Sequence, residues 1–238
     1  YVNFEKPVEE AELTAIRLGL QRLIRSEPLC YIEGKTEFHG LQLQIDNRVL
    51  IPRQETEYLV ELLSAKIEEK KPKTIWDICT GSGCIPIALK KKFPSCHIEA
   101  SDICDQALEV ALHNAKINSC DITFRKGDLF TPFKGLKADF IISNPPYISE
   151  IDYELLPVSV KQYEPKHALI AKDNGLEFYN KMAESILDFL NPGASCWFEI
   201  GETQADALCR LFSNKNFTII TCHKDLQGKD RYLELNRK

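Results

Sequence analysis

The sequence has no apolar run of the roughly eighteen residues that a membrane-spanning helix needs. Its first ten residues are acidic on balance and contain no hydrophobic core like that of a signal peptide. Positive charge is not in excess, because 30 Lys and Arg residues stand against 35 Asp and Glu residues, a net charge of −5. We therefore expect no membrane and no direct nucleic-acid partner, since binding to phosphates usually needs a basic face.

Nine cysteines are present, but no Cys-x-x-Cys pair. An odd number without paired spacing is not typical of a zinc site or a disulfide framework. Cys79, Cys196 and Cys222 lie in apolar, strand-like runs, which favours buried thiols in a reducing compartment. The 238 residues fit one or two domains, and a content of 44% hydrophobic and 27% charged residues excludes a disordered chain.

Two kinds of hydrophobic pattern divide the chain. Residues 8–25 predict a helix that Pro28 stops, residues 31–51 a β-hairpin with Asn47 at its turn, and residues 57–69 another helix. Strands are then predicted at 74–79, 97–102, 121–128, 138–144, 195–200, 217–223 and 231–236, and helices at 85–92, 106–118, 178–190 and 203–212. This alternation predicts an α/β fold with a mostly parallel sheet, helices on both faces and ligands beyond the carboxyl ends of the strands.

The first strand of this sheet runs into a glycine-rich loop, Asp77-Ile-Cys-Thr-Gly81-Ser-Gly83. Glycines at such a turn let the backbone approach a ligand closely. A dinucleotide fingerprint would need glycine or alanine where Pro86 stands, and the Gly-Lys-Ser/Thr of a phosphate loop is absent. By itself, the loop fits a structural strand-to-helix turn as well as a binding loop.

Acidic residues follow the next two strands. Asp102 lies twenty-one residues after Gly81, where a carboxylate can accept hydrogen bonds from both hydroxyls of a ribose. The alternative is a helix N-cap, which Asp105 could supply instead. Asp128 could accept from an adenine amino group, and Leu129 could pack on the ring. Three successive strand ends with this chemistry favour a nucleoside ligand over a bare structural sheet.

The fourth strand ends in Asn144-Pro145-Pro146-Tyr147. Two consecutive prolines make a stiff, non-helical edge that holds the Pro145 carbonyl outward, beside the side-chain carbonyl of Asn144. Two converging acceptors can bind both hydrogens of an NH₂ group, and Tyr147 can stack on a planar substrate. A rigid turn is the alternative interpretation, which the position at the switch-point end of the sheet disfavours.

Asp77 to Gly83, Asp102 and Asn-Pro-Pro-Tyr together resemble S-adenosylmethionine-dependent methyltransferases that modify amide or amino nitrogens. Other segments are similar, in order, to the HemK/PrmC-type protein-(glutamine-N(5)) methyltransferases, namely "PLCYIEGKTEFHG", "VLIPRQETE", "SNPPYI", "EPKHAL", "NGLEFY", "FEIG" and "DLQGKDR". This resemblance runs from about Pro28 to Arg231. It implies methylation of the glutamine amide nitrogen in the Gly-Gly-Gln motif of class-I peptide chain release factors, which supports translation termination. It also implies a class I methyltransferase fold, Rossmann-like with seven strands, and S-adenosylhomocysteine as the product.

The resemblance also assigns roles and domains. Asn144, Pro145 and Tyr147 are the expected catalytic residues, and Pro146 joins them in binding substrate. The expected cofactor-binding residues are Cys79, Thr80, Gly81, Ser82, Gly83, Asp102, Asp128, Leu129 and Asn144. No metal is implied, and the location is cytoplasmic or an organelle matrix. Residues 1–28 are expected to be the shortened remnant of an N-terminal helical domain, 29–52 a β-hairpin linker and 53–238 the catalytic domain.

The sequence departs from the family pattern at two places. Cys79 stands where the family usually has glycine, and residues 171–176 read AKDNGL in place of its Gly-Gly-x-Asp-Gly-Leu stretch. Roles stay open for four charged residues that either line the substrate cleft or brace the structure around it, namely Arg53, Glu55, Glu164 and Glu199.

Other functions fit parts of the same pattern. An adenine-N(6) DNA or RNA methyltransferase uses the same Asn-Pro-Pro-Tyr motif on a flipped base, but it would need a basic surface or an extra domain. A non-catalytic nucleotide-binding module is the alternative outside enzymes, and the intact motif argues against it. Pro86 argues against a nicotinamide dehydrogenase.

Overall fold

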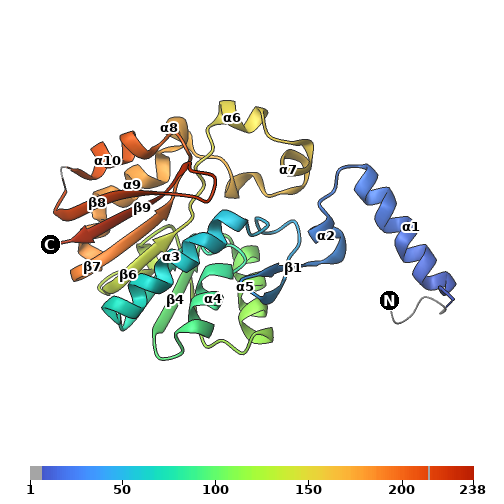
Figure 1. The fold of residues 1–238 in the computed structure, drawn as a ribbon, viewed down its shortest axis with the longest axis horizontal. Coiled ribbons are helices and arrows are strands. Elements are labelled where there is room, and N and C mark those ends of the chain that lie inside the picture. Colours follow the sequence, from blue (N-terminus) through green and yellow to red (C-terminus); the bar gives the residue numbers. More distant parts are fainter. Residues whose placement is uncertain (1–6, 214) are drawn as a thin grey trace.

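The computed structural model describes residues 7–213 and 215–238 and contains a central seven-stranded sheet (Figure 1). Its strands are β3 (Thr74–Ile78), β4 (His97–Asp102), β5 (Thr123–Lys126), β6 (Ala138–Ser143), β7 (Leu190–Glu199), β8 (Phe217–Lys224) and β9 (Asp230–Arg237). The strand order is β5-β4-β3-β6-β7-β9-β8, in which the first five strands are parallel and β9 is antiparallel to both of its neighbours. This confirms the predicted mostly parallel sheet.

The sheet places the strand ends of interest side by side. The chain runs outward from β3 to β4 and β5, and then crosses back so that β6 pairs with the other side of β3. The order therefore reverses at β3, and a crevice forms beyond the carboxyl ends of β3 and β6. The glycine-rich loop and the Asn-Pro-Pro-Tyr motif both start at this edge.

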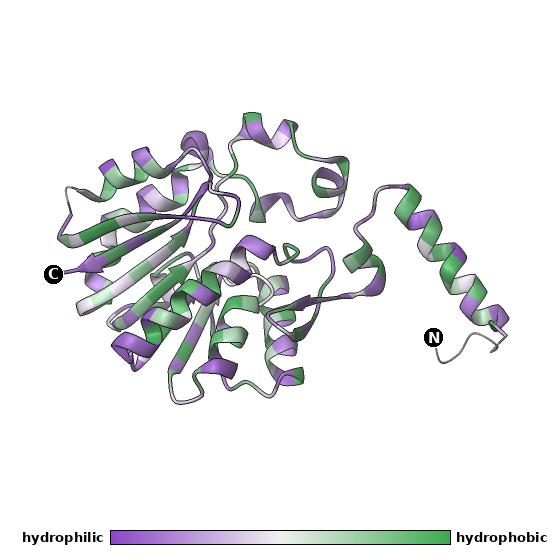
Figure 2. Cartoon of the chain, in the orientation of Figure 1, coloured by the Kyte–Doolittle hydropathy of each residue, from purple (hydrophilic) through white to green (hydrophobic). Residues whose placement is uncertain are grey.

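Helices cover both faces of the sheet (Figure 1). On one face lie α3 (Gln54–Lys70), α4 (Cys84–Lys92) and α5 (Asp105–Ile117), and on the other lie α9 (Glu177–Ser185) and α10 (Ala205–Ser213). Successive residues of β3 point to opposite faces, so Ile75 packs in the first apolar cluster while Trp76 and Ile78 pack in the second. Figure 2 shows hydrophobic residues in the central strands, and hydrophobic and hydrophilic residues alternating along the helices.

The N-terminal part holds two helices and a separate two-stranded sheet, namely α1 (Glu10–Ile24), α2 (Leu29–Glu33), β1 (Lys35–Phe38) and β2 (Leu41–Gln44). The hairpin confirms the predicted one, but placing its turn at Asn47 was wrong. The pairing of Phe38 with Leu41 leaves His39 and Gly40 as the turn, with φ of 52° and 73°. Two positive φ values match the right-handed twist of the strands, and Gly40 adopts one without strain. Asn47 lies in a later turn.

The first helix confirms the one predicted at residues 8–25 and stands apart from the sheet (Figure 1). It has no buried residue, and apolar side chains such as Ile24, which is 82% exposed, face away from the described structure. By contrast, Phe38 and Leu43 of the hairpin pack in the same apolar cluster as α3, α4 and α5. The domain boundaries at residues 28 and 52 remain predictions.

The segment between β6 and α9 contains two short helices that the pattern did not predict, α6 (Glu150–Glu154) and α7 (Val158–Tyr163), followed by α8 (Lys172–Gly175), a single turn with left-handed backbone at Asp173 and Asn174. Three 3₁₀ turns complete the described elements, at Thr131–Phe133, Lys166–Ala168 and Ile186–Phe189. The last one corrects the prediction of one helix over 178–190, because α9 ends at Ser185 and β7 already starts at Leu190. The pairing of β6 with β7 shifts register between Ala138 and Phe140, and this irregularity accommodates the Pro-Gly pair near the start of β7.

All nine cysteines are unpaired in the structure. Cys196 is buried as predicted, whereas Cys79 and Cys222 are only partly buried. Within residues 7–213 and 215–238, no helix combines the length and the apolar character needed to cross a bilayer.

Candidate functional site

A cavity lies at the carboxyl ends of β3, β4 and β6, where the sheet order reverses. Three groups of the predicted residues line it: Cys79, Thr80, Gly81 and Ser82 from the glycine-rich loop, Asp102 from β4, and Asn144 and Pro146 from the turn after β6. Gly83 lies behind the loop as the N-cap of α4, and a Cβ there would come within 3.1 Å of the Ala111 side chain. The structure thus brings together the motifs that follow three different strands.

The glycine-rich loop turns through left-handed backbone conformations. Gly81 and Gly83 have φ of 55° and 79°, and Cys79 has φ of 62°. A left-handed φ costs a side-chain-bearing residue about 1–2 kcal/mol more than it costs glycine. The first departure from the family pattern therefore leaves the loop conformation in place and adds local strain at Cys79.

Asp102 holds this loop from the neighbouring strand. Its carboxylate accepts hydrogen bonds from the backbone N–H groups of Gly81, at 2.9 Å, and of Cys104, at 3.0 Å. Burial raises the pKa of Asp102, and these two N–H donors oppose the rise. Each carboxylate oxygen keeps a lone pair for a further donor. The N-cap of α5 is Cys104, and Asp105 instead pairs with Lys126, so the two acidic residues have separate partners.

Polar atoms without partners lie next to the cavity. The Thr80 hydroxyl and both carboxylate oxygens of Asp77 are buried and make no hydrogen bond within the described part of the chain. Burial raises the pKa of Asp77 to about 8. Thr80 lines the cavity, while its buried hydroxyl faces the Asp77 carboxyl and opposes the rise of that pKa.

Asp128 and Leu129 do not line this cavity. They lie in the turn after β5 and face a separate, more open hollow that Lys134, Lys181 and Asp188 also line. Leu129 is buried and has φ of 48°, whereas Asp128 is exposed. The structure therefore brings Asp102 to the glycine-rich loop but leaves these two predicted residues apart from it.

A second cavity lies beside the first. Asn144, Pro145, Pro146 and Tyr147 all line it, together with Leu156 and Val160 from the segment of α6 and α7 and Glu199 from the end of β7. Five residues line both cavities, namely Leu50, Arg53, Asn144, Pro146 and Ala168. The Asn-Pro-Pro-Tyr turn thus forms part of the wall between two pockets, one on each side of Asn144.

Hydrogen bonds fix the side chains of this turn from behind. The Asn144 side-chain NH₂ donates to the Thr56 hydroxyl at 3.2 Å, and that hydroxyl donates to Glu199 at 2.7 Å. The Tyr147 hydroxyl donates to the other Glu199 oxygen at 3.4 Å. Burial raises the pKa of Glu199 to about 7, and the bond from Thr56 opposes the rise. The carbonyl of Pro145 accepts no hydrogen bond from the described residues.

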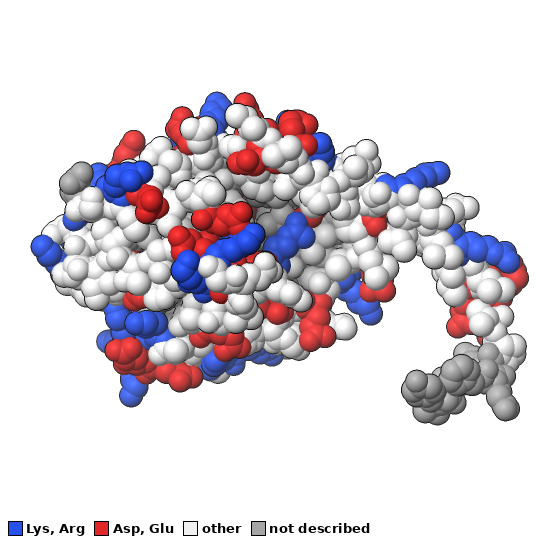
Figure 3. All heavy atoms as spheres, turned by 45° about the horizontal axis from the view of Figure 1, so that its top comes forward, with Lys and Arg blue, Asp and Glu red and all other residues white. Residues whose placement is uncertain are grey.

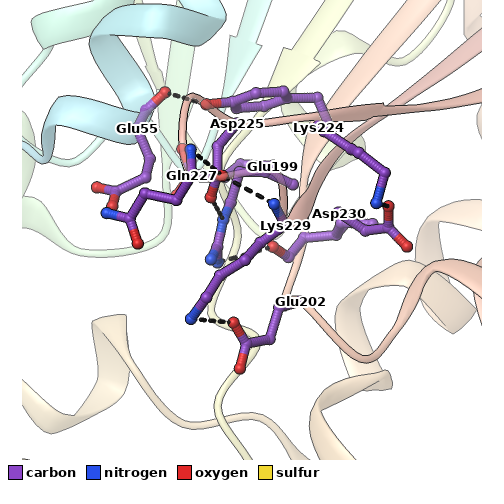
Figure 4. A network of polar contacts seen from close by, with 12 residues as sticks. Glu55, Glu199, Glu202, Lys224, Asp225, Gln227, Lys229 and Asp230 are labelled. Carbon is purple, nitrogen blue, oxygen red and sulfur yellow. Dashed lines mark hydrogen bonds and ion pairs between the residues drawn. The ribbon is translucent and has the colours of Figure 1, made fainter.

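The "DLQGKDR" segment lies beside Glu199 (Figure 4). Asp225 accepts from the backbone N–H groups of Gln227 and Lys229 and pairs with Arg231 at 3.3 Å. Arg231 donates in turn to the carbonyl of Ile200. This tight turn between β8 and β9 therefore anchors the strand end that carries Glu199.

The four charged residues whose roles the sequence left open have different surroundings in the structure. Arg53 lines both cavities and pairs with the buried Glu164 at 2.5 Å, and Glu164 also accepts from the N–H of Ile51 at 3.1 Å. Glu199 lines the second cavity, as described above. Glu55 lines neither of the two cavities and lies beside the β8–β9 turn (Figure 4).

The cavity-lining residues that were not predicted from the sequence include Thr56, His167 and Phe178. They lie in the "VLIPRQETE", "EPKHAL" and "NGLEFY" segments, which carried the family resemblance without a role for these side chains. Among the residues that the structure describes, no group of three or more His, Cys, Asp or Glu side chains could hold a metal ion.

Known proteins are similar to this chain in fold and in sequence. Residues 54–159 match the family described as Methyltransferase small domain. The catalytic domain of hMettl16, solved with a MAT2A 3′UTR hairpin, superimposes with a TM-score of 0.68 at 19% identity and covers 98% of this chain and 94% of its own. The fold is that of the class I S-adenosylmethionine-dependent methyltransferases, as predicted.

Relatives found by sequence similarity identify the family within this fold. The release factor glutamine methyltransferase of Geobacter sulfurreducens is 38% identical over 231 residues, which are 97% of this chain and 81% of the relative. That of Chlamydia trachomatis is 41% identical over 212 residues, 89% of this chain and 72% of the relative. At these identities and coverages, the chain belongs to the release factor glutamine methyltransferase family.

Proposed function

We propose that this chain transfers a methyl group from S-adenosylmethionine to the side-chain amide nitrogen of the glutamine in the Gly-Gly-Gln motif of class-I peptide chain release factors. S-adenosylhomocysteine is the second product, and no metal takes part. The observation that carries the proposal is the position of Asn144 and Pro146 in the walls of two adjoining cavities. A methyl donor in one cavity and a methyl acceptor in the other would meet at this turn.

The first cavity suits a nucleoside-bearing cofactor. Asp102 has lone pairs for ribose hydroxyls. Ile85, Ile103 and Phe178 supply apolar lining for a flat base. When bound there, S-adenosylmethionine supplies the electrophilic methyl group. Cys79, Thr80, Gly81 and Ser82 hold it in the proposed site, while Asp128 and Leu129 would contact it only from the neighbouring turn.

The second cavity suits a planar amide. The free carbonyl of Pro145 and the side-chain oxygen of Asn144 can each accept one N–H of a glutamine side chain. An amide nitrogen is a poor nucleophile because its lone pair is delocalised, and two acceptors shift electron density back onto it. They also hold the nitrogen in one orientation, which removes much of the entropic part of the barrier. Tyr147 lines the same cavity and is placed to pack on the amide plane.

The surface favours a protein acceptor over a nucleic acid. Lys and Arg side chains are interspersed with Asp and Glu around the hollow in the view of Figure 3, and the net charge is −5. An adenine-N(6) methyltransferase would need a continuous basic face for its polyanionic substrate. We place the activity where release factors act, in the cytoplasm or an organelle matrix.

Tandem mass spectrometry tests this function. The protein is incubated with S-adenosylmethionine and a purified release factor, and in parallel with an adenine-containing DNA or RNA oligonucleotide. The proposal expects the mass of one methyl group on the glutamine of the Gly-Gly-Gln peptide, and none when that glutamine is replaced by alanine. Methylation of the oligonucleotide alone, or of another release-factor residue, would overturn the assignment.

A further inference from the structure

Thr56 connects Asn144 to a buried acid. It lies in the first turn of α3 and is 2% exposed, while Glu199 ends β7 and is 1% exposed. The hydroxyl accepts from the Asn144 NH₂ group at 3.2 Å and donates to Glu199 at 2.7 Å. The resulting chain of bonds joins three elements that are distant in sequence, and nothing in the proposed chemistry accounts for it.

The proton count along this chain fixes the direction of each bond. An ionised carboxylate only accepts, and a threonine hydroxyl has a single hydrogen to donate. Because Thr56 gives that hydrogen to Glu199, it can only accept from Asn144. The nitrogen of the Asn144 amide must therefore face Thr56, and its oxygen must face the opposite way. The two ends of an amide have nearly the same shape, so only such a donor and acceptor pattern distinguishes them.

We propose that Thr56 and Glu199 are positioning residues that hold the Asn144 amide with its oxygen toward the methyl acceptor. This inference rests on the proposed function. If Asn144 were reversed, its NH₂ group would face the NH₂ group of the glutamine, and two donors cannot bond to each other. Neither positioning residue needs to touch the reacting atoms.

The charge on Glu199 decides whether the Asn144 amide keeps this orientation. A protonated Glu199 can donate to Thr56, whose hydroxyl is then free to donate to Asn144 and to stabilise the reversed amide. Burial raises the pKa of Glu199 to about 7. The titratable groups facing it come from α3, α4, α9, β9 and the turn after β6, namely Glu55, Cys84, Tyr179, Arg231, Tyr232 and Tyr147. Arg231 favours the ionised form and Glu55 opposes it.

Substitutions at Thr56 test this positioning of Asn144 through their effect on turnover. Thr56→Val keeps the shape but loses the hydroxyl, and we expect kcat to fall by about 10-fold, the effect of one lost hydrogen bond. Thr56 lines the cofactor cavity, so S-adenosylmethionine affinity is measured by calorimetry in the same variants and should fall by less than kcat does. Thr56→Ser restores the hydroxyl and should recover most of the loss. Ser64→Ala is the matched control, because Ser64 is a buried hydroxyl of the same helix that bonds only to the backbone of Val60.

A second measurement does not depend on methylation. In protein labelled with ¹⁵N-asparagine, the side-chain amide signals of Asn144 are identified by their loss in Asn144→Ala. In the wild type, we expect the chemical shifts of these signals to change with pH, with a midpoint near pH 7. In Thr56→Val, we expect this change to be absent. If the wild type methylates no release factor, the proposed function fails while this titration still decides the inference. Asn144 side-chain amide signals that do not differ between the wild type and Thr56→Val, or wild-type turnover in Thr56→Val, would overturn the inference.

Discussion

Asn144 is the residue on which the proposed chemistry depends most. Its side chain lines both cavities and is held by Thr56. Asn144→Ala should reduce turnover by about 10²–10³, as is typical when one preorganised polar group is lost, and should leave cofactor affinity mostly intact. Steady-state kinetics and calorimetry measure the two effects. Asn191→Ala is the control, because Asn191 bonds to Asp139 at the amino ends of β6 and β7, the ends away from the site. Near-normal turnover of Asn144→Ala would refute its role.

Asp102 should govern cofactor affinity instead. A carboxylate that accepts from the ribose contributes about 1.5–3 kcal/mol, so Asp102→Ala should weaken S-adenosylmethionine binding by about 10–100-fold. Because burial raises the pKa of Asp102, protonation at acidic pH should also weaken binding in the wild type. Calorimetry at several pH values measures both effects. An unchanged dissociation constant in the variant would show that the ribose binds elsewhere.

At this scale, the sequence predicted the residues that follow the strands and missed the residues that orient them. Asp102 and Asn144 each stand at a strand end, and the parallel sheet brings such positions together. Thr56 matters only because α3 packs it between Asn144 and Glu199, which is 143 residues further along the chain. A contact between residues so far apart leaves no local pattern.

At the scale of elements, Gly175 ties the segment after α7 to the Asn-Pro-Pro-Tyr turn. Asp173, Asn174 and Gly175 all have positive φ, so the AKDNGL stretch turns through left-handed backbone conformations. A Cβ on Gly175 would lie 2.1 Å from the backbone oxygen of Tyr147 and 2.5 Å from the Gln204 side-chain nitrogen. That nitrogen donates to the same Tyr147 oxygen at 3.0 Å.

Gly175→Ala should therefore destabilise the fold and displace the turn. We expect a loss of about 2–4 kcal/mol, the range for overpacking together with a broken buried contact, and a fall in turnover. Gly193→Ala is the matched control, because Gly193 also has a positive φ but open space around its Cβ position. Denaturant unfolding compares the two variants. Equal losses would mean that backbone strain alone, and not the contact with Tyr147, explains the glycine.

The elements that the sequence predicted well are those with long periodic patterns. Five strands of the sheet, β3, β4, β6, β7 and β9, and the helix α5 carry several buried residues each, so their apolar pattern is clear. The short helices α6 and α7 have at most one buried residue each and gave no such signal. Their position is set by contacts such as the Glu164 side chain with Arg53 and Ile51, on the other side of the cavities.

At the scale of the whole molecule, the site is built around carboxyl groups that burial makes costly to ionise. The pKa of Glu199 is raised to about 7 and that of Asp77 to about 8. A raised pKa means that the folded state binds a proton more tightly than the unfolded state does. Each of these groups therefore favours folding at low pH, and that contribution is lost as the pH rises toward the folded-state pKa.

Glu199→Gln should remove this cost. The amide cannot ionise, so the stability of the variant relative to the wild type should rise between pH 4.5 and pH 7 by about 3 kcal/mol, from the shift of the pKa from 4.5 to about 7. Denaturant unfolding at a series of pH values measures the difference. Glu184→Gln, at an exposed position of α9, is the control for replacing a glutamate by glutamine. A flat difference for Glu199→Gln would mean that Glu199 ionises as easily in the folded protein as in the unfolded chain. It would also remove the physical basis for the pH-dependent orientation of Asn144.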